Sequence, residues 1–166
     1  MNHWNTVEFL PEEGREVFGF FPEDESHTSS VFTMTYGYNT SERMLVPVPT
    51  WNKRKVLASN DYVREFKVLR KWPTNWVEMP ETGDIMNSDW SKIETAPTNG
   101  DEVIGLFYKE YHGMNPTIYG PFTMSFIGGE WVPTWDGSMV VEYTSYKSMD
   151  LPPTHWMHKP KPPTEE

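Results

Sequence analysis

The chain contains one sequence pattern twice. Residues 4–21 realign without a gap on residues 90–107. Three shorter matches follow in the same order: Phe-Thr-Met at 32–34 and 122–124, Val-Pro-Thr-Trp at 48–51 and 132–135, and Thr-x-Trp at 74–76 and 154–156. Four collinear matches predict a tandem duplication, so the second copy should repeat whatever architecture the first copy adopts.

The duplication also predicts the domain boundaries. We expect a first repeat unit over residues 1–80, a linker over 81–89, a second repeat unit over 90–160, and an extended, polyproline-like tail over 161–166. A unit of roughly 80 residues buries only about 60% of its unfolded surface and is marginal alone. We therefore expect the two units to pack on each other, helped by the large side chains of 8 Trp, 8 Tyr and 9 Phe.

Composition restricts the setting. The chain has no Cys, which excludes disulfides and thiolate zinc sites. The first residues lack the basic and apolar regions of a secretory signal, and no apolar run approaches the ~20 residues of a membrane helix. The net charge of −10 argues against non-specific binding to DNA or membranes. We expect a cytoplasmic protein that needs no cofactor or metal.

The pattern is typical of an all-β protein. Short apolar runs at 17–21 and 103–107 follow a Pro-x-x-Gly turn, as buried strands do. Further strands are predicted at 31–36, 44–48, 122–127 and 139–146, with a hairpin turn at Gly128-Gly129. We predict two small SH3-like or partly open β-barrel or β-roll units, with one short helix as an option.

Two segments refine that prediction. Residues 61–70 place Tyr62, Phe66 and Leu69 on one helical face, but they also alternate acceptably as a strand. We predict a strand there and leave the helix open. The Thr-x-Trp motif of each copy, followed within four residues by Pro, is interpreted as a final strand that closes the sheet.

Basic residues gather in one part of an otherwise acidic chain. Residues 42–72 carry eight bases and three acids, whereas residues 1–30 carry seven acids and one Arg. The plain interpretation of this basic band is a solvated strand face. The sharper interpretation is a site for a phosphate or another anionic ligand.

Both ends of the repeat resemble a known family. The opening Trp-x-x-Val/Ile-x-x-x-Pro-x-x-Gly-x-x-Val and the closing Thr-His-Trp-Met-x-x-Pro-x-Pro-Pro are similar to the two ends of domain-of-unknown-function family 551, short proteins common in phages and prophages. The second copy carries the fuller match, at Trp90, Ile93, Pro97, Gly100, Val103, Thr154, His155, Trp156, Met157, Pro160, Pro162 and Pro163. The first copy ends in Thr-Asn-Trp-Val and lacks the His and the Pro-Pro. The resemblance implies a phage setting and transfers no catalytic residue.

The sequence contains no catalytic signature. A nucleophile elbow, a Walker loop, a dinucleotide-binding loop and a zinc-peptidase motif are all missing. His155 and His158 flank Trp156 at a spacing that places them on opposite faces of a strand, so they are not expected to share a metal. We interpret His155 as a structural hydrogen-bonding residue, because Asn75 replaces it in the first copy and can also donate and accept.

The carboxylates and tryptophans that match between the copies have either a structural or a functional role. Glu16 matches Glu102, and such a pair is more simply a turn or strand-edge feature than an acid–base pair. Six tryptophans form three matched pairs, which favours core packing over an aromatic cleft that stacks a flat ligand. If a ligand site exists, we predict it from basic, aromatic and imidazole groups: Trp51, Arg54, Lys55, Arg64, Tyr108, Trp135 and His155.

These observations favour a non-enzymatic, phage-derived binding protein with an anti-defence role. It would act by occupancy, either by sequestering a small anionic, nucleotide-like ligand or by blocking a host protein. The first alternative is a minor virion or assembly protein, for which homo-oligomerisation is expected. The second is a nucleotide-directed hydrolase or lyase, for which His155 or His112 would be the general base.

Overall fold

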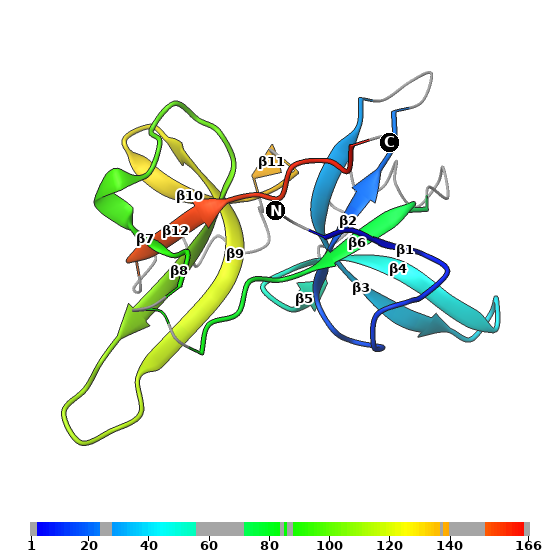
Figure 1. The fold of residues 1–166 in the computed structure, drawn as a ribbon, viewed down its shortest axis with the longest axis horizontal. Coiled ribbons are helices and arrows are strands. Elements are labelled where there is room, and N and C mark those ends of the chain that lie inside the picture. Colours follow the sequence, from blue (N-terminus) through cyan, green and yellow to red (C-terminus); the bar gives the residue numbers. More distant parts are fainter. Residues whose placement is uncertain are drawn as a thin grey trace. The chain divides into compact units, whose positions relative to one another are not determined.

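The computed structural model describes residues 3–23, 28–55, 72–83, 85, 88–136, 138–139 and 152–164. The chain divides into two compact units (Figure 1). The first comprises Met1–Met79 and Pro160–Glu166, and the second comprises Pro80–Lys159. The structure thus groups the predicted linker 81–89 with the second unit and the predicted tail 161–166 with the first.

The first unit is one antiparallel sheet. Its strands run in the order β1-β6-β2-β3-β4-β5, so the last strand lies between the first two. The bounds are β1 (Asn5–Thr6), β2 (Val17–Phe21), β3 (Ser30–Asn39), β4 (Met44–Trp51), β5 (Arg54–Lys55) and β6 (Asn75–Glu78).

The second unit repeats this order strand for strand. Its sheet runs β7-β12-β8-β9-β10-β11, also antiparallel throughout. The bounds are β7 (Ser91–Lys92), β8 (Val103–Lys109), β9 (Thr117–Ile127), β10 (Glu130–Trp135), β11 (Ser138–Met139) and β12 (His155–His158). A short 3-10 turn, η2 (Ile93–Thr95), follows β7.

The all-β prediction is confirmed, and each sheet is open rather than closed into a barrel. The sheets begin at β1 and β7 and end at β5 and β11, and no pairing joins these end strands in the described part of the chain. The Thr-x-Trp motifs form β6 and β12, which lie inside the sheets instead of at their edges. Residues 61–70, and most of the strand predicted at 139–146, lie outside the described residues.

Matched tryptophans form the core of each unit. Trp51 and Trp135 are 0% exposed, and Trp76, Trp90 and Trp156 are also buried. Because an indole ring supplies the largest apolar surface of any side chain, five buried rings provide much of the core of units this small. These five tryptophans are therefore core residues.

Each sheet also places a methionine over a glycine. A Cβ added at Gly19 would lie 2.6 Å from Sδ of Met34, and one at Gly105 would collide in the same way with Met124. Both methionines are fully buried. The two glycines are therefore required by close packing, not by backbone conformation, since neither has a positive φ.

Substitution of this glycine tests the packing. We expect Gly19→Ala to lower the free energy of unfolding by about 1–3 kcal/mol, because Met34 must shift within a filled core. Gly83→Ala is the matched control, since a Cβ there meets nothing within 4 Å. Urea denaturation of both variants checks this. Equal midpoints for the two variants would contradict the packing argument.

Candidate functional site

Two of the predicted ligand-binding residues meet in the second unit. His155 on β12 is paired with Leu106 of β8, and Tyr108 lies two residues further along β8. The rings of Tyr108 and His155 approach edge to face, with their centroids 6.0 Å apart and their planes at 86°. Both side chains are partly exposed.

The hydroxyl of Thr154 organises this pair. It accepts a hydrogen bond from the backbone N–H of Tyr108 at 2.9 Å and lies 2.8 Å from Nδ1 of His155. It also lies 3.3 Å from the carbonyl oxygen of Leu106. Since a hydroxyl has one proton, it either donates to Nδ1 or donates to a carbonyl and accepts from Nδ1–H. In both cases Thr154 fixes the orientation of the imidazole ring.

The surroundings of His155 favour its neutral form. Burial lowers the pKa of this imidazole, and the positive charge of Lys92 lowers it further, while the carboxylate of Glu94 acts in the opposite direction. Among the residues that the structure describes, none forms a hydrogen bond with Nε2. A neutral ring with Nε2 open offers a ligand one directed hydrogen bond, as either donor or acceptor.

The first unit has only part of this arrangement. Thr74 donates a 2.9 Å hydrogen bond to Oδ1 of Asn75, which takes the place of His155. In the alignment of the copies, however, Pro22 stands opposite Tyr108. The contact between the threonine hydroxyl and the residue that follows it is therefore shared by the two units, whereas the aromatic–imidazole contact is particular to the second unit.

Of the other predicted ligand-binding residues, two are buried and three have side chains outside the described part of the structure. Trp51 and Trp135 are completely buried and present no ring face to a ligand. Arg54 and Lys55 lie in β5, and their side chains are outside the described part of the structure, as is all of Arg64.

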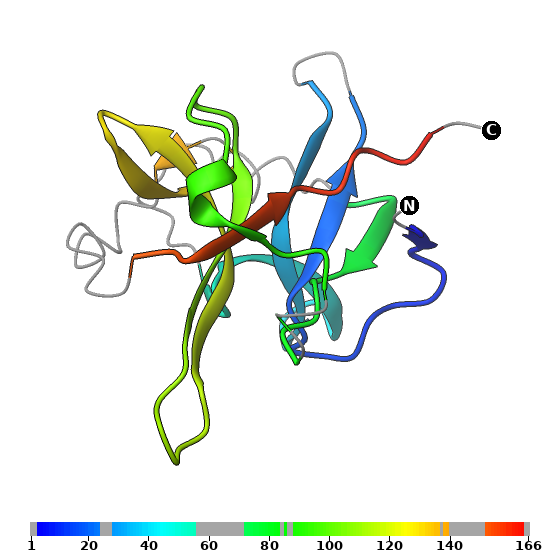
Figure 2. The same ribbon diagram turned by 60° about the vertical axis from the view of Figure 1, so that its left-hand side comes forward.

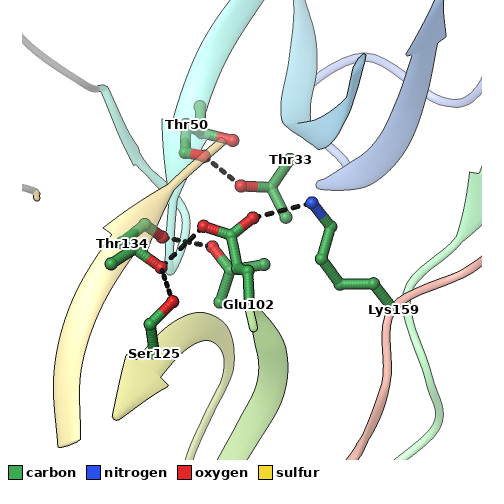
Figure 3. A network of polar contacts seen from close by, with 7 residues as sticks. Thr33, Thr50, Glu102, Ser125, Thr134 and Lys159 are labelled. Atoms are coloured by element: carbon green, nitrogen blue, oxygen red, sulfur yellow. Dashed lines mark hydrogen bonds and ion pairs between the residues drawn. The ribbon is translucent and has the colours of Figure 1, made fainter. Parts of the chain in front are cut away.

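A buried ionic network in the second unit was not predicted (Figure 3). The carboxylate of Glu102, just before β8, accepts a 2.7 Å bond from Nζ of Lys159 and a 2.6 Å bond from the hydroxyl of Thr134. The side chains of Glu102 and Lys159 are only 8% and 18% exposed. The network therefore ties the start of β8 to the end of β10 and to the residue that follows β12.

The matched carboxylate of the first unit has a different environment. Glu16 is 7% exposed and accepts a 2.7 Å hydrogen bond from the backbone N–H of Lys53, in the turn between β4 and β5. In the alignment of the two copies, Met79 stands opposite Lys159, so the first unit has no ammonium group at that position. Burial raises the pKa of Glu16, and the nearby Thr50 hydroxyl and Lys53 oppose that rise without cancelling it.

The two carboxylates should respond oppositely to neutralisation. Glu102→Gln leaves the ammonium of Lys159 without its counter-charge, so we expect the free energy of unfolding at pH 7 to fall by about 2–3 kcal/mol. A double-mutant cycle with Lys159→Met, which copies the first unit, measures the coupling. A coupling energy of zero would contradict the ion pair.

For Glu16→Gln the expected effect depends on pH. Burial raises the folded-state pKa of Glu16 above the ordinary pKa of a glutamate, which is 4.5. The corresponding stabilisation is complete below that value and is lost as the pH rises through the folded-state pKa. Gln removes this dependence, so the variant should gain stability relative to the wild-type protein between pH 4 and pH 7. Urea denaturation at both pH values checks this, and a loss over the same interval would contradict it.

Two hairpins reach beyond the sheets, and they are different hairpins in the two units. In the first unit the long hairpin is formed by β3 and β4. These strands pair from Met34, which lies opposite Pro49, to Asn39, which lies opposite Met44. The second unit extends β8–β9, which pair out to Lys109 opposite Thr117, and Figures 1 and 2 show this hairpin projecting from its sheet. We call them the β3–β4 arm and the β8–β9 arm.

Both arms expose large apolar side chains. Tyr38 and Met44 of the β3–β4 arm are 56% and 46% exposed. In the β8–β9 arm residues 109–118 are all exposed, and Met114 reaches 74%. The sequence signal for the β8–β9 arm is the spacing of matched blocks: fourteen residues separate Phe107 from Phe122, against ten between Phe21 and Phe32.

The described residues contain no cluster of three or more His, Cys, Asp or Glu side chains with the geometry of a metal site. Within the same residues, no helix has the length and apolar character to cross a membrane. No protein-family model, curated protein or solved structure matches the chain.

Proposed function

We propose that this chain is a non-enzymatic binding protein of phage origin that counters a bacterial defence by occupying the surface of a host protein. The observation that supports this best is the β8–β9 arm. Its end exposes Tyr111, Met114 and Ile118, which are 41%, 74% and 37% exposed. Apolar side chains held on a projecting hairpin bury little within their own unit and are placed to bury more against a partner.

The residue types of the arm fit a protein partner. Tyr combines a large apolar ring with a hydroxyl that can be satisfied across an interface, and Met adapts to irregular apolar surfaces. Both types are enriched at the centres of protein interfaces. The ring of Tyr111 is further oriented by Lys109, whose ammonium lies 5.0 Å from the ring centroid.

The charge of the chain favours a basic partner. A net charge of −10 attracts positively charged surfaces and repels nucleic acid. A host protein that binds nucleic acid presents such a surface. Occupation of that surface by an acidic protein would block it without any chemical reaction.

The small-ligand version of the hypothesis has less support. It requires flat aromatic rings beside basic groups, and Trp51 and Trp135 are fully buried. Among the described residues none forms a hydrogen bond with Nε2 of His155, but the charges that act on its imidazole, those of Glu94 and Lys92, have opposite signs. That environment does not select an anion.

The arm can be tested in cells. The wild-type protein and the variant Tyr111→Ser/Met114→Ser are each purified from bacteria with an active phage-defence system, and their native mass spectra are compared. Phe9→Ser is the control, because Phe9 is 75% exposed but belongs to neither arm. We expect a stoichiometric complex with a host protein for the wild type and the control. Loss of two interface side chains should weaken that complex about 10-fold or more.

Three outcomes would contradict the proposal. The first is a complex that the arm variant keeps in full. The second is a bound small molecule in place of a protein. The third is a wild-type protein that carries no partner at all, although the defence system that it is expected to counter is active.

A further inference from the structure

The first tryptophan of each copy performs the same task. Nε1 of Trp90 donates a 3.0 Å hydrogen bond to the carbonyl oxygen of Glu81, the residue after Pro80. Nε1 of Trp4 donates a 2.9 Å hydrogen bond to the carbonyl oxygen of Lys161, the residue after Pro160. In both units, therefore, an indole N–H binds the carbonyl group of the residue that follows a proline.

The segment held by Trp4 has the periodicity of a polyproline II helix. Residues 160–164 read Pro-Lys-Pro-Pro-Thr; Pro160 is buried and Pro163 half-buried, while the three residues beside them are exposed. Polyproline II has three residues per turn, so positions 160 and 163 lie on one side. These two prolines form the less exposed side of the segment, which is grouped with the first unit.

The surface around Trp4 is suited to such a segment. Trp4 is half-buried and packs edge to face against Phe20, with ring centroids 6.1 Å apart. Aromatic side chains that bury proline rings and donate a hydrogen bond to a backbone carbonyl are the usual means of recognising polyproline II segments. Residues 160–164 form no strand, and the described part of the chain gives them no backbone hydrogen bond to one.

We propose that the face of the first unit around Trp4 and Phe20 is a docking site for Pro-x-x-Pro segments. The chain's own residues 160–164 occupy the site, and a Pro-x-x-Pro segment of another protein competes with them for it. The tether makes the internal segment a strong competitor, because it is present at an effective concentration in the millimolar range. This inference does not depend on the proposed function.

A labelled peptide tests the docking site with purified components. The probe is a fluorescent peptide with the sequence of residues 158–166, and binding to the full chain is followed by fluorescence anisotropy. We expect the variant Pro160→Ala/Pro163→Ala, whose own segment is weakened, to bind the peptide at least about 10-fold more tightly than the wild-type chain. Addition of Trp4→Phe to that variant should abolish binding, while Trp90→Phe should not.

Two results would overturn the proposal. One is a folded Pro160→Ala/Pro163→Ala chain that does not bind the peptide. The other is binding that persists without the Trp4 indole, or that a peptide with alanine at every proline reproduces. Wild-type protein at millimolar peptide provides a second measurement if the variant does not fold: it must bind weakly, and Trp4→Phe must bind less.

Discussion

A buried indole N–H has to find an acceptor, and this requirement joins distant segments of each unit. Nε1 of Trp76 donates a 2.7 Å hydrogen bond to the carbonyl oxygen of Phe9. Nε1 of Trp156 donates a 2.9 Å bond to the hydroxyl of Thr95, which stands at the matching position of the second copy. The acceptor is a backbone carbonyl in the first unit and a side-chain hydroxyl in the second, but both belong to the same aligned position. Because an unsatisfied buried donor costs about 1–3 kcal/mol, this bond fixes the loop after the first strand against the last strand.

Both units share this arrangement of strands and tryptophans, but they differ in their long hairpins and in the partners of one buried carboxylate. The first unit extends β3–β4 and the second extends β8–β9, so one duplicated sheet presents two arms of different origin. The buried carboxylates also differ, since Glu102 has Lys159 as a partner and Glu16 relies on a backbone N–H. Divergence at the arms with retention of the core is the pattern expected when loops carry function and the sheet provides the scaffold.

Much of the fold could be predicted from the repeat alone. The matched apolar runs became β2 and β8, and the diglycine became the β9–β10 turn, where Gly128 and Gly129 both have positive φ. The long-range placement could not be predicted. Nothing local in the sequence indicates that Trp4 bonds to residue 161, because a proline segment has the same extended shape wherever it docks.

The candidate site was predictable only in part. The aromatic ring of Tyr108 and the imidazole of His155 predict a ligand site, and the two residues lie at one place. The rings of Trp51 and Trp135 support the same prediction, but their burial depends on packing that composition does not reveal. Exposed arm residues such as Met114 carry no local motif, and only the unequal spacing of the matched blocks indicates them.

The matched tryptophans anchor the core of each unit, and we propose that the arms carry the contact surface. Hydrogen exchange of the Trp76 and Trp156 indole protons, followed by NMR, tests it most directly. We expect both protons to exchange only when their unit unfolds, and the amides of residues 111–116 to exchange rapidly. Rapid exchange of both indole protons in the folded protein would show that the tryptophans line an open cleft, and it would contradict the account.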